Sequence, residues 1–383
     1  MPVIESKLPD VGTTIFTVMS RKAEAHGAIN LSQGFPDFAL PAGLGEALAR
    51  HVAAGRNQYA PMAGVLALRE QIALKLGRCY GCRVDPEAEV TVVPGATEAI
   101  FCAIMATVRA GDEVILFDPS YDSYEPSVRL AGGRAVRIPL LPPAFAIDWQ
   151  RVAEALTPRT RMIVINSPHN PSGAVLSASD LQALVEILRG NDIVLLSDEV
   201  YEHIIFDGRQ HESVLRVPEL AARSIVISSF GKTFHCTGWK LGYAVAPAAL
   251  SAEFRKVHQY LTFCSFTPAQ WAIAEMLERQ PQHYHELPAF YQQKRDAFRA
   301  LLSSSRFRLL DVPGGYFQLV DYTAISDLDD LAFCHWLTVE KGVTAIPLSP
   351  FYRDPPKDLR LARLCFAKTE STMALAAERL CAV

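Results

Sequence analysis

One lysine, Lys232, has the sequence surroundings of a reactive amine. It follows an apolar, β-rich run at 225–227, with the hydroxyl of Ser229 three residues before it and a second cation, Lys240, eight residues after it. A lysine in water has a pKa of about 10.4, but partial burial or a nearby cation lowers that pKa and frees the lone pair for attack on a carbonyl. Ser229 and Lys240 would suit a phosphate. The spacing therefore predicts a lysine Schiff base to an aldehyde cofactor that carries a phosphate; the alternative is a solvated loop lysine.

The turn at 94–97, Pro-Gly-Ala-Thr, is a second candidate site. It joins an expected strand at 89–93 to an expected helix at 98–108. Free backbone N–H groups at a helix N-terminus, a glycine that allows close approach and the hydroxyl of Thr97 together make an anion site. The alternative is an ordinary strand-to-helix turn in which Thr97 is the helix N-cap.

Two further polar clusters follow apolar runs. Residues 166–173, Asn-Ser-Pro-His-Asn-Pro-Ser-Gly, predict turns locked by prolines that hold the amide of Asn170 rigidly, so that it could donate to a phenolate oxygen, whereas His169 is expected to be structural. Asp198 ends a very apolar strand, where a buried carboxylate needs a cationic partner. A protonated pyridine nitrogen would serve, and Tyr201 could reach the same ring. The alternative is an aspartate paired with an arginine in the core.

Arg363 lies in the apolar stretch at 361–366. A guanidinium there is costly unless it binds a carboxylate, which its forked geometry matches well. The alternative is a structural salt bridge. Arg360 competes for the same role, although strand alternation would send the two side chains to opposite faces.

Length and composition indicate an ordinary globular enzyme. A chain of 383 residues, half of them hydrophobic and a fifth charged, predicts a large domain and a smaller one. The net charge of -4 gives no attraction to nucleic acid or to an anionic membrane. No apolar run approaches the roughly eighteen residues of a membrane span, and the N-terminus is not typical of a secretion signal. We therefore expect a cytoplasmic protein with no nucleic-acid or membrane partner.

The eight cysteines are scattered and predict reduced thiols instead of a disulfide framework. Residues 79–82 form a lone Cys-x-x-Cys motif. A zinc site would need a second pair or histidines at matching spacing, so we expect no metal.

Alternating strands and helices predict the fold. Between residues 65 and 247, continuous apolar strands alternate with helical stretches, which is typical of a doubly wound, mostly parallel α/β domain. Long helices and a strand pair after residue 247 predict a smaller α+β domain. We assign residues 1–43 to an N-terminal arm and part of the small domain, 44–275 to the large domain and 276–383 to the small domain. Expected strands of the large sheet are 89–93, 113–117, 135–140, 161–166, 193–198, 225–229 and 242–246.

Taken together, these motifs resemble a known family. The stretches NSPHNPSG, SDEVYEH, SSFGKTFHCTGWKLGY and RLCFAK, in this order, resemble the fold type I pyridoxal-phosphate aminotransferases of class I/II. The stretches LSQGFPDF, NQYAPMAG and VPGGYFQL are similar to the subgroup that contains kynurenine, glutamine and methionine aminotransferases. The resemblance covers nearly the whole chain and implies a homodimer.

The resemblance implies a role for each candidate residue. Lys232 would form the Schiff base with pyridoxal 5'-phosphate and then move the proton between the substrate α-carbon and the cofactor. Asp198 would keep the pyridine nitrogen protonated, and Tyr121 would stack on the ring. The phenolate oxygen would be bound by Asn170 and Tyr201. The phosphate would be held by Gly95, Ala96, Thr97, Ser229, Lys240 and the partner subunit's Tyr59. One departure concerns Lys240, because many family members carry arginine there, although this subgroup tolerates lysine.

The resemblance also implies how a substrate is bound. Arg363, Asn170 and the backbone of Gly34 would receive the α-carboxylate. An aromatic side-chain pocket would be formed by Phe16, Phe35, Tyr59, Tyr121 and Phe263. No second arginine suggests itself for a side-chain carboxylate, which favours methionine as the amino donor, with aromatic amino acids and glutamine next, over aspartate; a 2-oxo acid would be the acceptor. Phe16 stands where kynurenine enzymes often carry tryptophan, which disfavours kynurenine as the donor.

Three other functions compete with that of an aminotransferase. A carbon–sulfur β-lyase acting on cystathionine or cysteine S-conjugates would share the fold and the same motifs. A non-catalytic regulator would need an additional DNA-binding segment, for which the chain has no room. A nicotinamide dehydrogenase is disfavoured because no Gly-x-Gly-x-x-Gly motif opens a helix after a strand.

Overall fold

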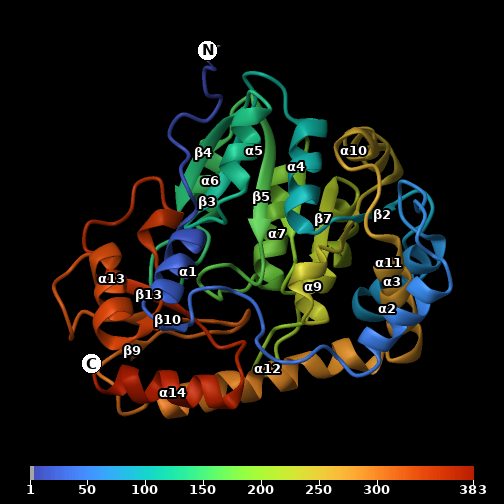
Figure 1. Cartoon of the computed structure of the whole chain (residues 1–383). Coiled ribbons are helices and arrows are strands. Elements are labelled where there is room, and N and C mark those ends of the chain that lie inside the picture. Colours follow the sequence, from blue (N-terminus) through green and yellow to red (C-terminus); the bar gives the residue numbers. More distant parts are fainter. Residues whose placement is uncertain (1–3) are drawn as a thin grey trace.

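A seven-stranded sheet forms the centre of the molecule (Figure 1). The computed structural model describes residues 4–383; the first three residues of the expected N-terminal arm lie outside the described residues. Along the sheet the order is β2, β8, β7, β6, β5, β3, β4, and β8 runs antiparallel to both of its neighbours while β7 to β4 are parallel. The bounds are β2 Val90–Val93, β3 Glu113–Asp118, β4 Arg134–Pro139, β5 Thr160–Asn166, β6 Val194–Asp198, β7 Ser224–Ser229 and β8 Gly242–Val245.

The central strands are apolar along their whole length because helices cover both faces. In β3, Val114 and Leu116 pack into a cluster with α4, α5 and α10, whereas Ile115 and Phe117 pack into the cluster that contains α3, α7 and α11. The same alternation recurs in β5, β6 and β7, as expected for a parallel sheet between two helical layers. These helices are α3 Leu66–Tyr80, α4 Ala96–Thr107, α5 Tyr124–Leu130, α7 Ala178–Leu188, α10 Ala248–Leu261 and α11 Thr267–Arg279.

A second sheet lies beside the first and is antiparallel. Its four strands have the order β12, β13, β10, β9. A short parallel pair, β1 with β11, joins the N-terminal part of the chain to the C-terminal part. The long helix α12 runs along the lower edge of the molecule to meet α14 (Figure 1). The bounds are α1 Ile15–Ala25, β1 Ile29–Asn30, α12 Gln282–Leu301, β9 Arg308–Leu309, β10 Phe317–Asp321, α13 Asp330–Lys341, β11 Val343–Thr344, β12 Ile346–Pro347, β13 Leu361–Cys365 and α14 Glu370–Cys381.

The expected strands of the large sheet are all confirmed to within one residue at each end. Lys232 lies in the short helix α9, so the alternative of a solvated loop lysine is wrong. A helix of four residues shows no 3.6-residue apolar period, so the sequence pattern cannot reveal it. The division at residues 43 and 275 stays a prediction. Other short or peripheral helices are α2 Leu44–Ala53, α6 Trp149–Ala155, α8 Pro218–Ala221 and α9 Phe230–Thr233.

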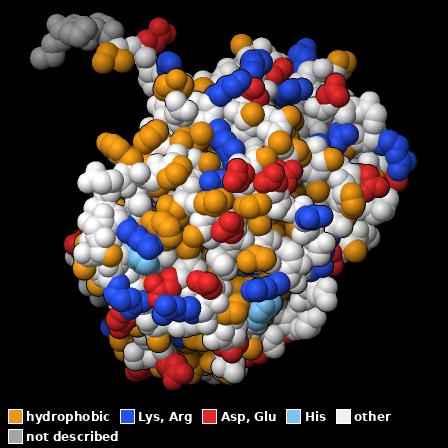
Figure 2. All heavy atoms as spheres, turned by 90° about the vertical axis from the view of Figure 1, so that its right-hand side faces the viewer, with side chains coloured by type: hydrophobic (Ala, Val, Ile, Leu, Met, Phe, Trp, Pro, Cys, Tyr) orange, Lys and Arg blue, Asp and Glu red, His pale blue; other side chains and the backbone are white. Residues whose placement is uncertain are grey.

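Helices α2, α3, α10 and α11 build one side of the molecule, on the right in Figure 1. Figure 2 looks at this side and shows hydrophobic side chains exposed in several groups among charged ones. Within residues 4–383, no helix is long and apolar enough to cross a membrane.

Candidate active site

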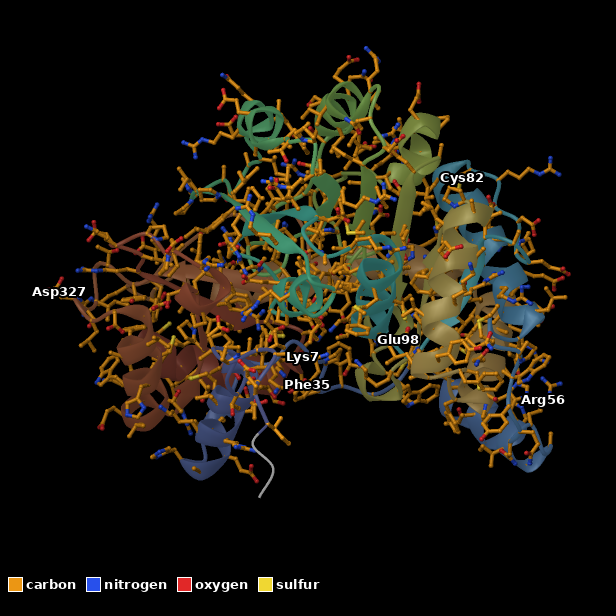
Figure 3. All side chains as sticks on the ribbon, turned by 90° about the horizontal axis from the view of Figure 1, so that it is seen from above. Lys7, Phe35, Arg56, Cys82, Glu98 and Asp327 are labelled. Carbon is orange, nitrogen blue, oxygen red and sulfur yellow. The ribbon has the colours of Figure 1, made fainter. Side chains whose placement is uncertain are left out.

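A cavity of about 290 Å³ lies where β5, β6 and β7 end, at Asn166, Asp198 and Ser229. Seen from above, Phe35, which lines it, lies in the middle of the molecule, between the ends marked by Asp327 and Arg56 (Figure 3). The cavity brings together nearly all of the residues singled out from the sequence. They are Phe16, Gly34, Phe35, Gly95, Ala96, Thr97, Tyr121, Asn170, Asp198, Tyr201, Ser229, Lys232, Lys240 and Arg363.

Lys232 presents a partly buried amine to this cavity. Its Nζ donates a hydrogen bond to the backbone oxygen of Gly34 at 3.2 Å and lies 5.7 Å from the ring centre of Tyr201 and 5.6 Å from that of Tyr316. Among residues 4–383, no carboxylate forms an ion pair with it. Burial, helped by nearby cations, lowers the pKa of Lys232 to about 8. A pKa near 8 leaves roughly a tenth of this amine unprotonated at pH 7, far more than in a lysine in water.

Asp198 is a buried carboxylate that forms no ion pair with a basic side chain of residues 4–383. It is 4 % exposed at the end of β6. Its Oδ2 accepts a hydrogen bond from the Tyr124 hydroxyl at 2.7 Å, and its Oδ1 accepts one from the backbone N–H of Val200 at 3.3 Å. Burial raises the pKa of Asp198 to about 6. Since no lysine or arginine of the described chain forms an ion pair with Asp198, the alternative of an aspartate paired with a core arginine is wrong, and the carboxylate remains available to a cation from outside the chain.

The first turn of α4 offers an anion site. Gly95, not Thr97, is the N-cap, and no side chain caps the free N–H groups. A Cβ at Gly95 would stand 3.3 Å from Nζ of Lys240, so the glycine lets this lysine approach the helix N-terminus closely. Within the described chain, the Lys240 side chain has no hydrogen-bond or ion-pair partner. The helix N-terminus and the ammonium therefore fit a phosphate, with the Ser229 hydroxyl at the same edge of the sheet.

Arg363 is fully buried in β13 and forms no ion pair with a carboxylate of residues 4–383. Its Nη1 donates to Asn170 Oδ1 at 2.7 Å and its Nη2 to the backbone oxygen of Ser32 at 2.8 Å, while Nε is buried and has no partner among residues 4–383. Burial lowers the pKa of Arg363 to about 10. Arg360, in contrast, pairs with Asp327 at 2.7 Å. Arg363 therefore forms no structural salt bridge in the described chain and fits a carboxylate ligand.

Tyr59 and Phe263 lie outside this cavity. Tyr59 is 84 % exposed and Phe263 is 41 % exposed, and their rings meet edge-on with 5.4 Å between their centres. Neither residue is among those that line the cavity. Their roles in cofactor and substrate binding stay predictions.

Sequence reasoning missed three residues that shape the site. Asn166 fixes two expected residues, because its Nδ2 donates to the backbone oxygen of Asp198 at 2.9 Å and its Oδ1 accepts from the N–H of Asn170 at 2.8 Å. Its position at the end of a strand was a signal that could have identified it. Tyr316, which donates to the Gly34 backbone oxygen at 2.6 Å, and Tyr124 gave no such signal.

His169, in contrast, is structural as expected. Its ring nitrogens form hydrogen bonds with Ser172 Oγ at 2.7 Å and with the backbone oxygen of Pro119 at 3.0 Å. Burial lowers the pKa of His169 to about 4, so the ring is neutral at ordinary pH.

The unbalanced groups of the cavity fit the expected cofactor and substrate. The free helix N-terminus with Lys240 suits the phosphate of pyridoxal phosphate, the carboxylate of Asp198 suits its ring nitrogen, and the amine of Lys232 suits its aldehyde. The guanidinium of Arg363, whose buried Nε has no partner, is left for the carboxylate of an amino acid.

The chain is similar to several known proteins over nearly its whole length. A family profile described as aminotransferase class I and II matches residues 26–380. The chain is 58% identical to a methionine aminotransferase of Escherichia coli (strain K12) over 376 residues, which cover 98% of this chain and 97% of that protein. The solved structure of YbdL from Escherichia coli, with a methionine aminotransferase function, superposes with a TM-score of 0.97 at 57% identity and covers all of both chains. A variant of the aspartate aminotransferase of Thermus thermophilus superposes with a TM-score of 0.90 at 32% identity and covers all of both chains.

The lowered pKa of Lys232 predicts selective reactivity. In protein treated with hydroxylamine to remove any carbonyl ligand, labelling of Lys232 by a small acylating reagent should rise with pH around a midpoint of about 8, because the amine reacts only when unprotonated. Peptide mass spectrometry measures the labelling, and the Lys232→Ala variant identifies the peptide. A midpoint near the ordinary lysine value of about 10.4 would contradict the described environment.

Proposed function

We infer that this chain moves the α-amino group of methionine to a 2-oxo acid. The premise is its family: the chain belongs to the aminotransferase class I and II family and is a pyridoxal-phosphate-dependent transaminase of fold type I. The observation that carries the inference is the placement of one amine, Lys232, and one unpaired buried carboxylate, Asp198, in the same cavity. The methionine aminotransferase of Escherichia coli, at 58% identity, supports the choice of donor.

Bound pyridoxal phosphate supplies a ring that withdraws electrons from the α-carbon of the substrate. Lys232 would hold the cofactor through its aldehyde carbon. Once released, its amine would take the proton from the substrate α-carbon and deliver it to the cofactor. Its lowered pKa suits both tasks, since a general base works best when its pKa lies near the working pH. Asp198 would keep a proton on the ring nitrogen, and Asn170 and Tyr201 would donate to the phenolate oxygen.

Arg363 would orient the substrate by its carboxylate. The guanidinium is fixed by Asn170 and by the backbone of Ser32, and it lies 3.9 Å above the ring of Phe317, so its direction is set before a ligand arrives. A preorganised bidentate donor holds the α-carbon in a reactive position at little entropic cost. The backbone of Gly34 lines the same part of the cavity.

The remaining wall of the cavity favours an apolar side chain. Among the described residues that line it, the lysines and arginines are Lys232, Lys240 and Arg363, and each already has a role. No further cation of this chain is left in the lining to bind a side-chain carboxylate, whereas Phe16 and Phe35 offer aromatic surface. This favours methionine, then aromatic amino acids and glutamine, over aspartate.

Transamination is favoured over the carbon–sulfur β-lyase. The relatives reported above are named for aminotransferase activity. A lyase would share Lys232, Asp198 and Arg363, so the decisive difference is chemical: a lyase releases pyruvate from cystathionine without an added 2-oxo acid.

We also propose that the chain works as a homodimer in which the partner subunit's Tyr59 reaches the phosphate. Tyr59 and Phe263 stand exposed beside further exposed apolar side chains in the 260–266 segment. Exposed hydrophobic groups of this kind mark protein–protein contacts. The cytoplasmic location expected from the sequence stays a prediction.

The proposed function is tested by turnover. The purified protein should transfer the amino group of methionine to a 2-oxo acid faster than that of aspartate, and Lys232→Ala should abolish turnover while still binding pyridoxal phosphate. A panel of amino donors assayed against one 2-oxo acid measures the first point, and cofactor absorbance after dialysis measures the second. Full transamination by Lys232→Ala, or pyruvate release from cystathionine as the main activity, would contradict the proposal.

Arg363→Ala should chiefly weaken substrate binding. Loss of a charged hydrogen-bond donor costs about 1.5–3 kcal/mol, so KM for methionine should rise about 10- to 100-fold while cofactor binding is retained. Arg360→Ala is the matched control and should leave KM unchanged, because that arginine pairs with exposed Asp327. Arg363→Lys keeps a positive charge in the buried site and serves as the second variant if Arg363→Ala fails to fold. An unchanged KM in a folded Arg363→Ala protein would move the carboxylate site elsewhere.

Subunit mixing tests whether Tyr59 acts across the dimer. Tyr59→Ala should bind the cofactor weakly and Lys232→Ala should be inactive, but a mixture allowed to exchange subunits should regain activity at limiting cofactor. The mixed dimer contains one site with Lys232 from one chain and Tyr59 from the other. No recovery in proven mixed dimers would show that Tyr59 acts within its own chain or not at all.

A further inference from the structure

Tyr124 is a buried tyrosine in contact with the carboxylate that the cofactor needs. It is the first residue of α5, and its hydroxyl donates to Asp198 Oδ2 at 2.7 Å. Both side chains are almost completely buried. We propose that Tyr124 is a positioning residue that aims the Asp198 carboxylate at the cofactor ring and holds it in the ionised form. The proposal rests on the proposed function, in which Asp198 binds the ring nitrogen.

The contacts of Asp198 leave one of its carboxylate oxygens able to accept a further hydrogen bond. Its backbone oxygen accepts from Asn166 Nδ2 and from the N–H of Ser167, at 2.9 and 3.1 Å, which fixes the main chain. Tyr124 occupies Oδ2, whereas Oδ1 has only the long bond from Val200 at 3.3 Å. A carboxylate has about four acceptor positions, so Oδ1 retains capacity for a strong donor. The tyrosine thus fixes the rotation of the carboxylate and leaves Oδ1 free for the ring.

The surroundings of Tyr124 fix its ring and direct its hydroxyl to Asp198. Its ring meets that of Tyr121 edge-on, with 5.7 Å between the ring centres, and it lines a second cavity together with Phe117 and Val164. Within residues 4–383, its hydroxyl has Asp198 as its hydrogen-bond partner. Burial, followed by the neighbouring carboxylate, raises the pKa of Tyr124, so the phenol stays protonated and acts as a donor throughout the working pH range.

The hydrogen bond also has an electrostatic consequence. A donor to a carboxylate favours the charged form, whereas burial favours the neutral acid. Burial already raises the pKa of Asp198 to about 6, and loss of the phenol would raise it further. More of the carboxyl group would then be protonated at neutral pH, and a neutral acid cannot stabilise a cationic ring. The groups that face Asp198 are Tyr124, Lys232, Glu199, Tyr121 and Tyr201.

Tyr124→Phe removes the donor and keeps the ring. In the holoenzyme, the acid limb of the pH profile of kcat/KM for methionine should move to higher pH by about one unit, and pyridoxal phosphate should bind about 10-fold more weakly to the apoenzyme at neutral pH. Cofactor titration by fluorescence measures the second effect without turnover. Tyr322→Phe is the matched control: this buried tyrosine donates to the backbone oxygen of Leu328 at 3.1 Å, and its loss should move neither quantity.

A second variant should shift the acid limb of the pH profile in the opposite direction. A fluorinated tyrosine at position 124 is a stronger donor of nearly the same shape, so it should move the acid limb to lower pH. This variant tests the proposal even where Tyr124→Phe proves unstable. Equal pH profiles in the wild type and in both variants would overturn the proposal.

Asp198→Asn separates this inference from the proposed function. Wild-type turnover and cofactor affinity in Asp198→Asn would refute the role of the carboxylate itself. Loss of both there, with Tyr124→Phe indistinguishable from Tyr322→Phe, would refute only the role of the tyrosine. Under the proposal, Tyr124→Phe produces no further shift of the pH profile when Asp198 has already been replaced.

Discussion

The structure depends on charges that the fold buries in one cavity without pairing them with one another. Asp198 and Arg363 are almost inaccessible to water, and within the described chain neither forms an ion pair. A buried charge without a counter-charge destabilises a folded protein, so these groups are costly unless a ligand completes them. Each has a matching group in pyridoxal phosphate or in an amino acid. Binding should therefore neutralise the site and stabilise the fold together.

The arrangement of the two sheets explains how such groups come to lie together. Parallel strands β5, β6 and β7 end at one edge of the sheet. Asp198 is the last residue of β6, and Lys232 lies in the short helix that follows β7. Arg363 and Gly34 come from the other part of the molecule, where the N-terminal segment and β13 lie side by side, as the hydrogen bond from Cys365 to Leu31 shows. The cavity is therefore formed by segments from both ends of the sequence, and a substrate bound as proposed through Arg363 would join the two parts.

Residues that follow strands could be predicted from the sequence, whereas contacts over long sequence distances could not. Asp198 was identified because a carboxylate at the end of an apolar strand has few explanations, and Arg363 because a guanidinium in an apolar strand has few as well. Tyr124 touches Asp198 across 74 positions and Tyr316 touches Gly34 across 282, and no local pattern encodes either meeting. The four residues of α9 are too few for a helical period, and the roles predicted for the exposed Tyr59 and Phe263 stay predictions.

The protonation state of the cofactor ring tests the central claim most directly. Nitrogen NMR of the holoenzyme, reconstituted with pyridoxal phosphate that carries ¹⁵N in its ring, reports whether that nitrogen bears a proton. If Asp198 completes its charge with the ring, the signal at neutral pH should be that of a protonated pyridine, and it should change to that of a neutral pyridine in Asp198→Asn. A neutral ring nitrogen in the unaltered enzyme would contradict the account.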